Sequence, residues 1–368
     1  MAKQYRVGII GRTGKGNYGH GIDTVWADVP ATTVVAVADE NDEGRAEAAQ
    51  RTGAANAYAD YREMLDKEQL DIVGVGPRWV DMHHELVLAC AERGCHMYME
   101  KPFCRTLVEA DEMIRELEMR HLKLAIAHQT RWTPLLPVVQ EAIAAGEIGQ
   151  LMEIRARGKE DGRGGGEDLW VLGSHVLDLM RAFGGDPLNC YASVWNKGHS
   201  ATSADVAEGN EGIGLLTGDS INGRYQLPNG VTGYIASNRG LAGAPSRFGL
   251  QIFGSKGIIE FFTGYLTPAF ILRDSSWSPG RSGKGWETIS SQGIGKPETE
   301  GGAGLGGGNI AAVHDLIQCI ENDGQPKCSM YDARATVEMI AAIFESHRQG
   351  RPVSLPLENR ENPLASLA

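Results

Sequence analysis

The sequence predicts a chain of two main parts, an α/β domain with a parallel sheet and an α+β domain with a large, mostly antiparallel sheet. From Tyr5 to about Ala127, short apolar runs alternate with helical stretches, which is typical of a parallel sheet covered by helices on both faces. After Gln129, strands follow one another with few helices between them, as expected of an antiparallel sheet.

The elements of the first part follow from local patterns. Short apolar runs predict five buried strands, at Val7–Ile10, Val34–Ala38, Ile72–Val75, His96–Met99 and Leu124–Ala127. Helical spacing lies between them, for example at Gly44–Arg51, His83–Glu92 and Ala110–Met119. Strand and helix in alternation predict a doubly wound sheet of the Rossmann type.

The second part has a different order of predicted helices and strands. We expect a helix at Pro134–Ala145 closed by Gly146, a strand at Leu151–Arg157, a helix at Leu169–Phe183, and strand pairs at Arg224–Leu227 with Val231–Ser237 and at Phe248–Phe253 with Gly257–Phe262. The stretch Ser275–Gly308 is rich in Gly, Ser and Pro, so it predicts a long loop that acts as a substrate lid or partner arm outside the core.

Two closing helices are expected near the C-terminus, at Ala311–Ile320 and Asp332–His347. The expected organisation is therefore a dinucleotide-binding domain over 1–128, a substrate and oligomerisation domain over 129–310, and closing helices with a tail over 311–368 at the domain junction. The antiparallel sheet offers a flat face for pairing, so a homo-oligomer is expected.

Composition limits the function classes. The 368 residues are 42% hydrophobic and 22% charged, which is ordinary for a globular protein, and the net charge of −12 disfavours nucleic acid as a partner. Six scattered cysteines without a C-x-x-C pair favour reduced thiols in a cytoplasmic protein over disulfides or a metal site. We find neither a signal peptide nor an apolar stretch long enough to cross a bilayer, so no membrane partner is expected.

A glycine-rich loop follows the first predicted strand. After Gly11, it contains the G-x-G-x-x-G spacing as Gly14, Gly16 and Gly19, which lets backbone approach a pyrophosphate at the start of the next helix. Asp39 closes the second strand, where a carboxylate accepts hydrogen bonds from ribose hydroxyls and repels a 2′-phosphate. The loop and the acid predict NAD rather than NADP; an ordinary Gly-rich turn is the alternative.

Six short motifs, in order, resemble the glucose–fructose oxidoreductase / inositol dehydrogenase / rhizopine-catabolism family. They are Pro77 followed by His83-His84-Glu85, then Met99-Glu100-Lys101-Pro102, Ala127-His128-Gln129-Thr130-Arg131-Trp132, Gly146-Glu147-Ile148-Gly149, Gly173-Ser174-His175-Val176-Leu177-Asp178, and Phe253-Gly254-Ser255-Lys256-Gly257. The resemblance covers roughly residues 5 to 357 and implies an NAD-dependent enzyme.

The resemblance also implies residue roles. Lys101 would lie beside the nicotinamide and the reacting hydroxyl, His175 would be the general base, and Pro102 would follow a cis peptide bond. Pro77, His83 and Glu100 become candidates for the cofactor side of the site. Arg131, Trp132 and Asp168 become candidates for the substrate side.

Several of these residues have structural alternatives. His175 lies on an otherwise apolar helix and could be a core histidine, and Lys101 could be a solvated lysine at a turn. Asp178, three residues after His175, either orients the imidazole or pairs with an arginine such as Arg181. Asp168 could instead be the N-cap of the helix that follows.

The sequence departs from the family pattern in two places, and the first is a longer glycine loop. The second is a single position before the histidine. The family often has an aspartate one helical turn before the histidine, and here that position is Val171. Glu167 and Asp168 stand nearby, and either could replace the carboxylate.

The leading functional prediction is a dehydrogenase that transfers a hydride from a secondary hydroxyl of a sugar, sugar derivative or cyclic polyol to NAD. The first alternative is a redox-neutral lyase or glycosidase that uses NAD transiently through a keto-sugar. The second is a non-catalytic NAD or sugar sensor, which would have no need of both Lys101 and His175.

Overall fold

The computed structural model describes residues 3–301 and 304–367. The chain divides into two compact units, Met1–Gln129 with Asn210–Gly214 and Leu305–Arg334, and Thr130–Gly209 with Leu215–Gly304 and Ala335–Ala368. The C-terminal part expected over 311–368 is therefore shared between the units. In the part of the chain described, no helix is both long and apolar enough to span a membrane.

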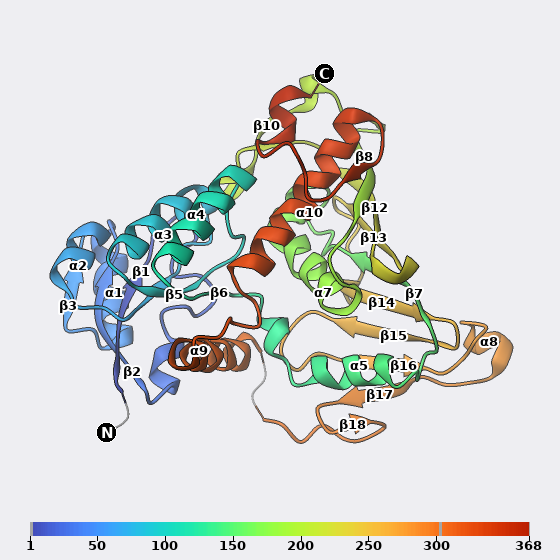
Figure 1. Cartoon of the computed structure of the whole chain (residues 1–368), viewed down its shortest axis with the longest axis horizontal. Helices are drawn as coiled ribbons and strands as arrows, with labels where there is room; N and C mark the ends of the chain where they lie inside the picture. Colours follow the sequence, from blue (N-terminus) through green and yellow to red (C-terminus); the bar gives the residue numbers. More distant parts are fainter. Residues whose placement is uncertain (1–2, 302–303, 368) are drawn as a thin grey trace. The chain divides into compact units, whose positions relative to one another are not determined.

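The first unit contains a parallel sheet of six strands in the order β3-β2-β1-β4-β5-β6 (Figure 1). The strands are β1 Tyr5–Ile10, β2 Thr32–Ala38, β3 Asn56–Tyr58, β4 Ile72–Val75, β5 His96–Met99 and β6 Leu124–Ile126. This order confirms the predicted doubly wound sheet. Strand β3 was not predicted, because its three residues are largely exposed at the sheet edge and carry no apolar run.

The helical elements of this unit are η1 Val25–Asp28, α1 Asp42–Thr52, α2 Tyr61–Lys67, η2 Val80–Met82, α3 His83–Glu92, α4 Leu107–Met119, η6 Asn210–Gly212 and α9 Leu305–Asn322, with η3 Gln129–Trp132 at its boundary. Side-chain N-caps stabilise the start of two of these helices. The side chain of Asn41 accepts a hydrogen bond from the backbone nitrogen of Gly44 in α1, and that of Thr106 accepts one from the backbone nitrogen of Glu109 in α4.

The helix expected directly after the glycine loop is absent. Residues 13–24 form turns that lead into the short 3₁₀ helix η1, and α9 packs against η1, β5 and β6. The prediction of an α-helix N-terminus at the pyrophosphate was therefore wrong for this loop. Four glycines and Asn17 hold positive φ between Gly14 and Gly21, and left-handed backbone at these positions prevents a continuous helix there.

The second unit is built on an eleven-stranded sheet, ordered β18-β17-β16-β15-β14-β7-β13-β12-β8-β19, with β9 also paired to β8. Only the β7–β13 pair is parallel among these described strands, which confirms the mostly antiparallel sheet. The strands are β7 Leu151–Arg157, β8 Asn189–Asn196, β9 His199–Ser200, β12 Ser220–Gln226, β13 Thr232–Asn238, β14 Gly249–Gly254, β15 Gly257–Phe262, β16 Ala269–Leu272, β17 Glu287–Ser290, β18 Gly293–Ile294 and β19 Val353–Ser354; a separate ribbon joins β10 Ala207–Glu208 and β11 Leu215–Leu216.

The glycine-rich stretch Ser275–Gly308 is not a free arm along its whole length. It contains α8 Pro279–Ser282, the strands β17 and β18, and the first turn of α9. Ile289 in β17 is buried. The prediction that this stretch lies outside the core was wrong for these strands, because strands of four and two residues are too short to show the alternation that marks a strand.

Helices cover the second sheet, and a π-helical turn interrupts the one that contains His175. The predicted helix at Leu169–Phe183 is α6 Gly166–Asp168, a π-helical turn η4 at Leu169–Gly173, and α7 Ser174–Gly184. Figure 1 shows α7 along β7, β13 and β14, with which it is in contact. The remaining elements of this unit are α5 Leu135–Ala144, η5 Ser203–Asp205, η7 Pro228–Gly230, η8 Pro363–Ser366 and α10 Met330–Gln349, whose first turns belong to the first unit. Single π-turns of this kind occur often at functional sites.

Candidate active site

The glycine loop is shaped by close backbone contacts. Gly16 has φ of +88° and Gly19 has φ of +67°, a region that residues with a Cβ rarely adopt. A Cβ on Gly16 would lie 2.3 Å from the backbone nitrogen of Arg78, and one on Gly19 would lie 2.5 Å from Cγ of Glu100. The loop therefore packs directly against the carboxyl ends of β4 and β5, where a doubly wound sheet binds its ligand.

Asp39 lies at the end of β2 and is buried. Its carboxylate accepts hydrogen bonds from the hydroxyl of Thr13 at 2.7 Å, the backbone nitrogen of Thr13 at 3.0 Å and that of Asn41 at 3.0 Å. Asp39 lines a pocket together with Glu40 and Arg12, and the Arg12 guanidinium is paired with Asp81 at 2.8 Å. Two carboxylates and a neutralised arginine give this pocket a charge that suits ribose hydroxyls and disfavours a 2′-phosphate.

Lys101 follows β5 and is buried, not solvated as one alternative had it. The Lys101–Pro102 peptide bond is cis, which confirms the prediction for Pro102. His83, at the start of α3, is fully buried and holds this turn: its Nε2 lies 2.7 Å from the carbonyl oxygen of Pro77 and its Nδ1 lies 2.7 Å from that of Pro102. Burial lowers the pKa of His83. Both ring nitrogens thus contact backbone carbonyl oxygens, so His83 shapes the Lys101 turn.

Glu100 connects this turn to the glycine loop. One carboxylate oxygen accepts hydrogen bonds from the backbone nitrogen and Nδ1 of His20, both at 2.7 Å, and the other accepts from the backbone nitrogen of Lys101 at 3.1 Å. Burial alone would raise the pKa of Glu100, but hydrogen bonds from His20 and the charges of His20 and Lys101 outweigh it and hold the pKa below its ordinary value. Glu100 is therefore a buried carboxylate that joins His20 of the glycine loop to the Lys101 turn.

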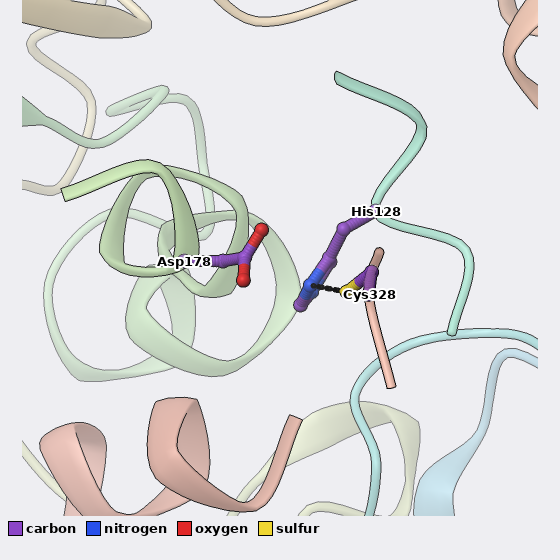
Figure 2. Close-up of side chains that lie close together, drawn as sticks. All are labelled: His128, Asp178 and Cys328. Atoms are coloured by element: carbon purple, nitrogen blue, oxygen red, sulfur yellow. Dashed lines mark hydrogen bonds between the residues drawn. The ribbon is translucent and has the colours of Figure 1, made fainter. Parts of the chain in front are cut away.

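A buried thiol and imidazole pair lies in the same unit. Figure 2 shows His128, just after β6, with its Nδ1 3.5 Å from Sγ of Cys328. The backbone nitrogen of Ile126 also donates to the carbonyl oxygen of Cys328 at 3.0 Å, so this segment extends the sheet edge. All six cysteine side chains of the chain are buried. Burial of this kind fits their use as small apolar side chains.

In the second unit, His175 lies in the first turn of α7 and is partly exposed. Its ring meets that of Phe248 edge to face, with centroids 6.2 Å apart and an angle of 82° between the planes. Val171, at the position where the family often has an aspartate, is buried in the π-turn. Its apolar side chain cannot supply the hydrogen bonds that a carboxylate would.

Asp178, which is also labelled in Figure 2, belongs to the second unit and is fully buried. One of its oxygens lies 3.4 Å from Nη1 of Arg131 and 4.0 Å from Nη1 of Arg181. These contacts favour the alternative in which Asp178 pairs with arginines, and Arg131 is the nearer of the two. Trp132 is buried beside Arg131 in the chain. Arg131 thus has a fixed, neutralising partner on α7.

Asp168 is the buried carboxyl group closest in sequence to the π-turn. One oxygen accepts hydrogen bonds from the hydroxyl of Ser237 and from the backbone nitrogen of Glu160. Its other oxygen is buried and has no hydrogen-bond partner among the residues described. Burial raises the pKa of Asp168 above its ordinary value. The N-cap alternative was wrong, because the carboxylate bonds to these two groups and not to the first turn of α7. Glu167 beside it is also buried.

The polar surroundings of Asp168 are closely built. A Cβ on Gly158 would lie 1.9 Å from the bonded oxygen of Asp168, so only glycine allows this approach. Glu160 holds φ of +61° and its carboxylate pairs with Arg157 at 2.7 Å and Arg247 at 2.9 Å. Sequence reasoning missed Ser237 and Glu160, because they lie 69 and 8 residues from Asp168 and no motif joins them. His20 could have been found, since it directly follows the last loop glycine.

The fold, the glycine loop and the acid after β2 define a dinucleotide-binding oxidoreductase with a separate sheet domain. Family models identify the family to which the chain belongs. Residues 5–128 match the oxidoreductase family with an NAD-binding Rossmann fold, and residues 138–260 match the GFO/IDH/MocA C-terminal domain. The chain belongs to this GFO/IDH/MocA family, whose cofactor is NAD. The residues around the loop fit that cofactor, because Asp39 and Glu40 line a pocket together with Gly11, the first glycine of the loop.

Curated relatives match most of the chain. Levoglucosan dehydrogenase of Pseudarthrobacter phenanthrenivorans is 25% identical over 352 residues, covering 87% of this chain and 89% of the relative. D-apiose dehydrogenase of Paraburkholderia graminis is 26% identical over 357 residues, covering 92% and 87%. Among solved structures, levoglucosan dehydrogenase in complex with NADH and L-sorbose has a TM-score of 0.78 at 22% identity, covering 96% of this chain and all of the other. The last comparison shows a shared fold.

Proposed function

We propose that this protein is an NAD-dependent dehydrogenase that oxidises a secondary hydroxyl of a sugar, a sugar derivative or a cyclic polyol. The observation that supports this most is the buried Lys101 at a cis-proline turn, tied through Glu100 to the glycine loop of an NAD-binding domain. A lysine buried at such a turn is suited to stabilise negative charge on a substrate oxygen.

NAD, when bound beside the glycine loop and Asp39, would supply the acceptor for the hydride of the carbon that carries the hydroxyl. The hydroxyl proton passes to the imidazole of His175, which acts as the general base. Lys101 stabilises the alkoxide that develops on the oxygen, so the carbonyl product forms without a free alkoxide. Arg131, held by Asp178, and the indole of Trp132 contribute to the substrate side.

We further propose that Asp168 takes the part of the carboxyl group that Val171 cannot supply. Its unpartnered oxygen is a buried acceptor, and leaving such a group unsatisfied costs about 1–3 kcal/mol unless a ligand or water completes it. A substrate hydroxyl is the natural donor. Glu167, which is also buried, is the alternative replacement.

The substrate class rests on the relatives. Levoglucosan, apiose and inositol dehydrogenases share this family, and each is named for a polyhydroxylated substrate. The relatives are named as dehydrogenases, so nothing in them supports the redox-neutral lyase or glycosidase. A cytoplasmic location and a homo-oligomer paired through the second sheet complete the proposal.

A panel of monosaccharides, anhydrosugars and inositols, incubated with NAD and followed by NADH absorbance, tests the proposal. We expect at least one compound to give continuous NADH formation that the Lys101→Met variant lacks. Substrate consumption without NADH accumulation would favour the redox-neutral alternative. Tight sugar or NAD binding without turnover of any compound would favour the sensor and contradict the proposal.

A further inference from the structure

The glycine loop lacks the support that a following helix usually gives. In a doubly wound fold, the first helix begins at the loop and fixes its last turn. Here residues 13–24 form turns and one isolated bridge, and the next regular element along the chain is the four-residue η1. The loop must therefore be held in shape by other groups, and the structure identifies them.

His20 is the residue at which those groups converge. Its backbone nitrogen and Nδ1 are both bound by Glu100, as described above. Its carbonyl oxygen accepts a hydrogen bond from Nδ2 of Asn309 at 2.8 Å. The loop is thus held at one residue by a carboxylate from the end of β5 and an amide from the first turns of α9.

Asn309 is itself fixed in one orientation. It is 1% exposed, and its Oδ1 accepts hydrogen bonds from the hydroxyl of Tyr98 at 2.7 Å and from Nε2 of Gln129 at 3.2 Å. Two donors on Oδ1 leave the Nδ2 group to face the carbonyl oxygen of His20. A buried amide with its donor and acceptor sides both engaged is a rigid connection.

The sequence before Asn309 makes this contact possible. The first turn of α9 contains Gly306, Gly307 and Gly308, and Gly308 is buried. A Cβ on Gly308 would lie 2.6 Å from Cβ of Gln129 and 3.2 Å from its carbonyl oxygen. Glycine at position 308 lets α9 approach closely enough for Asn309 to reach the loop, which explains this glycine despite its entropic cost in a helix.

We propose that Asn309 is a positioning residue for dinucleotide binding, which holds the end of the glycine loop at His20 in place of the missing first helix. The inference rests on the proposed use of NAD and concerns a residue outside the glycine motif. Loss of the Asn309 donor would remove the hydrogen bond to the carbonyl oxygen of His20. The loop would then populate backbone conformations that do not bind the cofactor, and the apparent affinity would fall.

Titration of the full-length protein with NADH, followed by NADH fluorescence, tests this without knowledge of the substrate. Asn309→Asp keeps the size and the two acceptor contacts but replaces the donor with an oxygen. We expect its Kd for NADH to rise about tenfold, as for the loss of one hydrogen bond and a repulsive contact in its place. Asn322→Asp is the matched control, since Asn322 is exposed in the same helix and donates to the carbonyl oxygen of Gln318 at 2.9 Å.

Two further variants separate positioning from stability. Tyr98→Phe removes a partner of Asn309 but leaves its donor, so we expect a lower melting temperature with a Kd changed less than threefold. Asn309→Ala removes the donor without adding charge, and it should weaken NADH binding even if Asn309→Asp fails to fold. An unchanged Kd in every folded Asn309 variant would overturn the inference alone. Failure of the unmodified chain to bind NADH would overturn the proposed function with it.

Discussion

Glu100→Gln is the perturbation whose outcome follows most directly from the structure. The carboxylate accepts two hydrogen bonds from His20 through one oxygen and a third from the Lys101 nitrogen through the other. Glutamine has one acceptor oxygen, and its NH₂ group must face at least one of these N–H donors. The substitution therefore removes at least one contact and replaces it with two opposed donors.

The expected loss is about 2 kcal/mol of unfolding free energy at neutral pH. A hydrogen bond to a charged acceptor is worth about 1.5–3 kcal/mol, and the lower desolvation cost of burying a neutral amide offsets part of the remaining loss. Glu116→Gln on α4 is the control, because the carboxylate of Glu116 pairs with Arg120 at the surface and such pairs contribute little.

Urea unfolding followed by circular dichroism, over a range of pH, measures the effect. The lowered pKa of Glu100 means that its contribution is complete above the unfolded value of 4.5 and is lost as the pH falls through the lower folded value. The gap between the unmodified chain and Glu100→Gln should thus be constant near neutrality and shrink below pH 4.5. A variant as stable as the unmodified chain at pH 7, or a gap that widens in acid, would refute the reasoning.

Three other predictions concern the two halves of the site. Asp39→Ala should weaken NAD binding and reduce the difference in affinity between NAD and NADP, measured by titration of both cofactors. Tighter binding of NADP than of NAD by the unmodified chain would contradict the assignment of NAD as the cofactor. Gly16→Ala places a Cβ 2.3 Å from the Arg78 nitrogen at φ of +88°, so NADH affinity should fall at least tenfold in the same titration, whereas Gly53→Ala, also at positive φ but with no atom near its Cβ, should leave it unchanged. Asp168→Asn should lower kcat/KM nearly as much as His175→Ala if Asp168 replaces the missing carboxylate, and steady-state rates equal to those of the unmodified chain would return that role to Glu167 or to His175 alone.

Much of the fold could be predicted from the sequence, because buried strands are marked by apolar runs. The runs at Ile72–Val75, His96–Met99 and Gly257–Phe262 coincide with observed strands. Elements without such a signal were missed: β3 is exposed at an edge, and β17 and β18 are too short. The π-turn at Leu169–Gly173 was read as ordinary helix, because one extra residue in a turn leaves no visible mark on a short apolar pattern.

The candidate site, like the fold, could be predicted only where local sequence carries a signal. Residues within motifs, such as Lys101 before the cis Pro102, could be found because local sequence specifies a local turn. The glycine spacing correctly marked the loop, but it wrongly implied the helix after it. Partners that come from distant segments, such as Ser237 for Asp168 and Asn309 for His20, could not be found, since only the folded chain brings them together.

Single-turnover NADH formation tests the central claim most directly. The unmodified chain, Lys101→Met and His175→Ala are each mixed with saturating NAD and an active compound from the panel, and NADH binding is titrated separately. We predict that both variants lose about 10²–10⁴-fold in rate while their NADH affinity changes little, since Asp39 and the glycine loop lie on other strand ends. A His175→Ala rate close to that of the unmodified chain would contradict the account and would leave the proton transfer to Lys101.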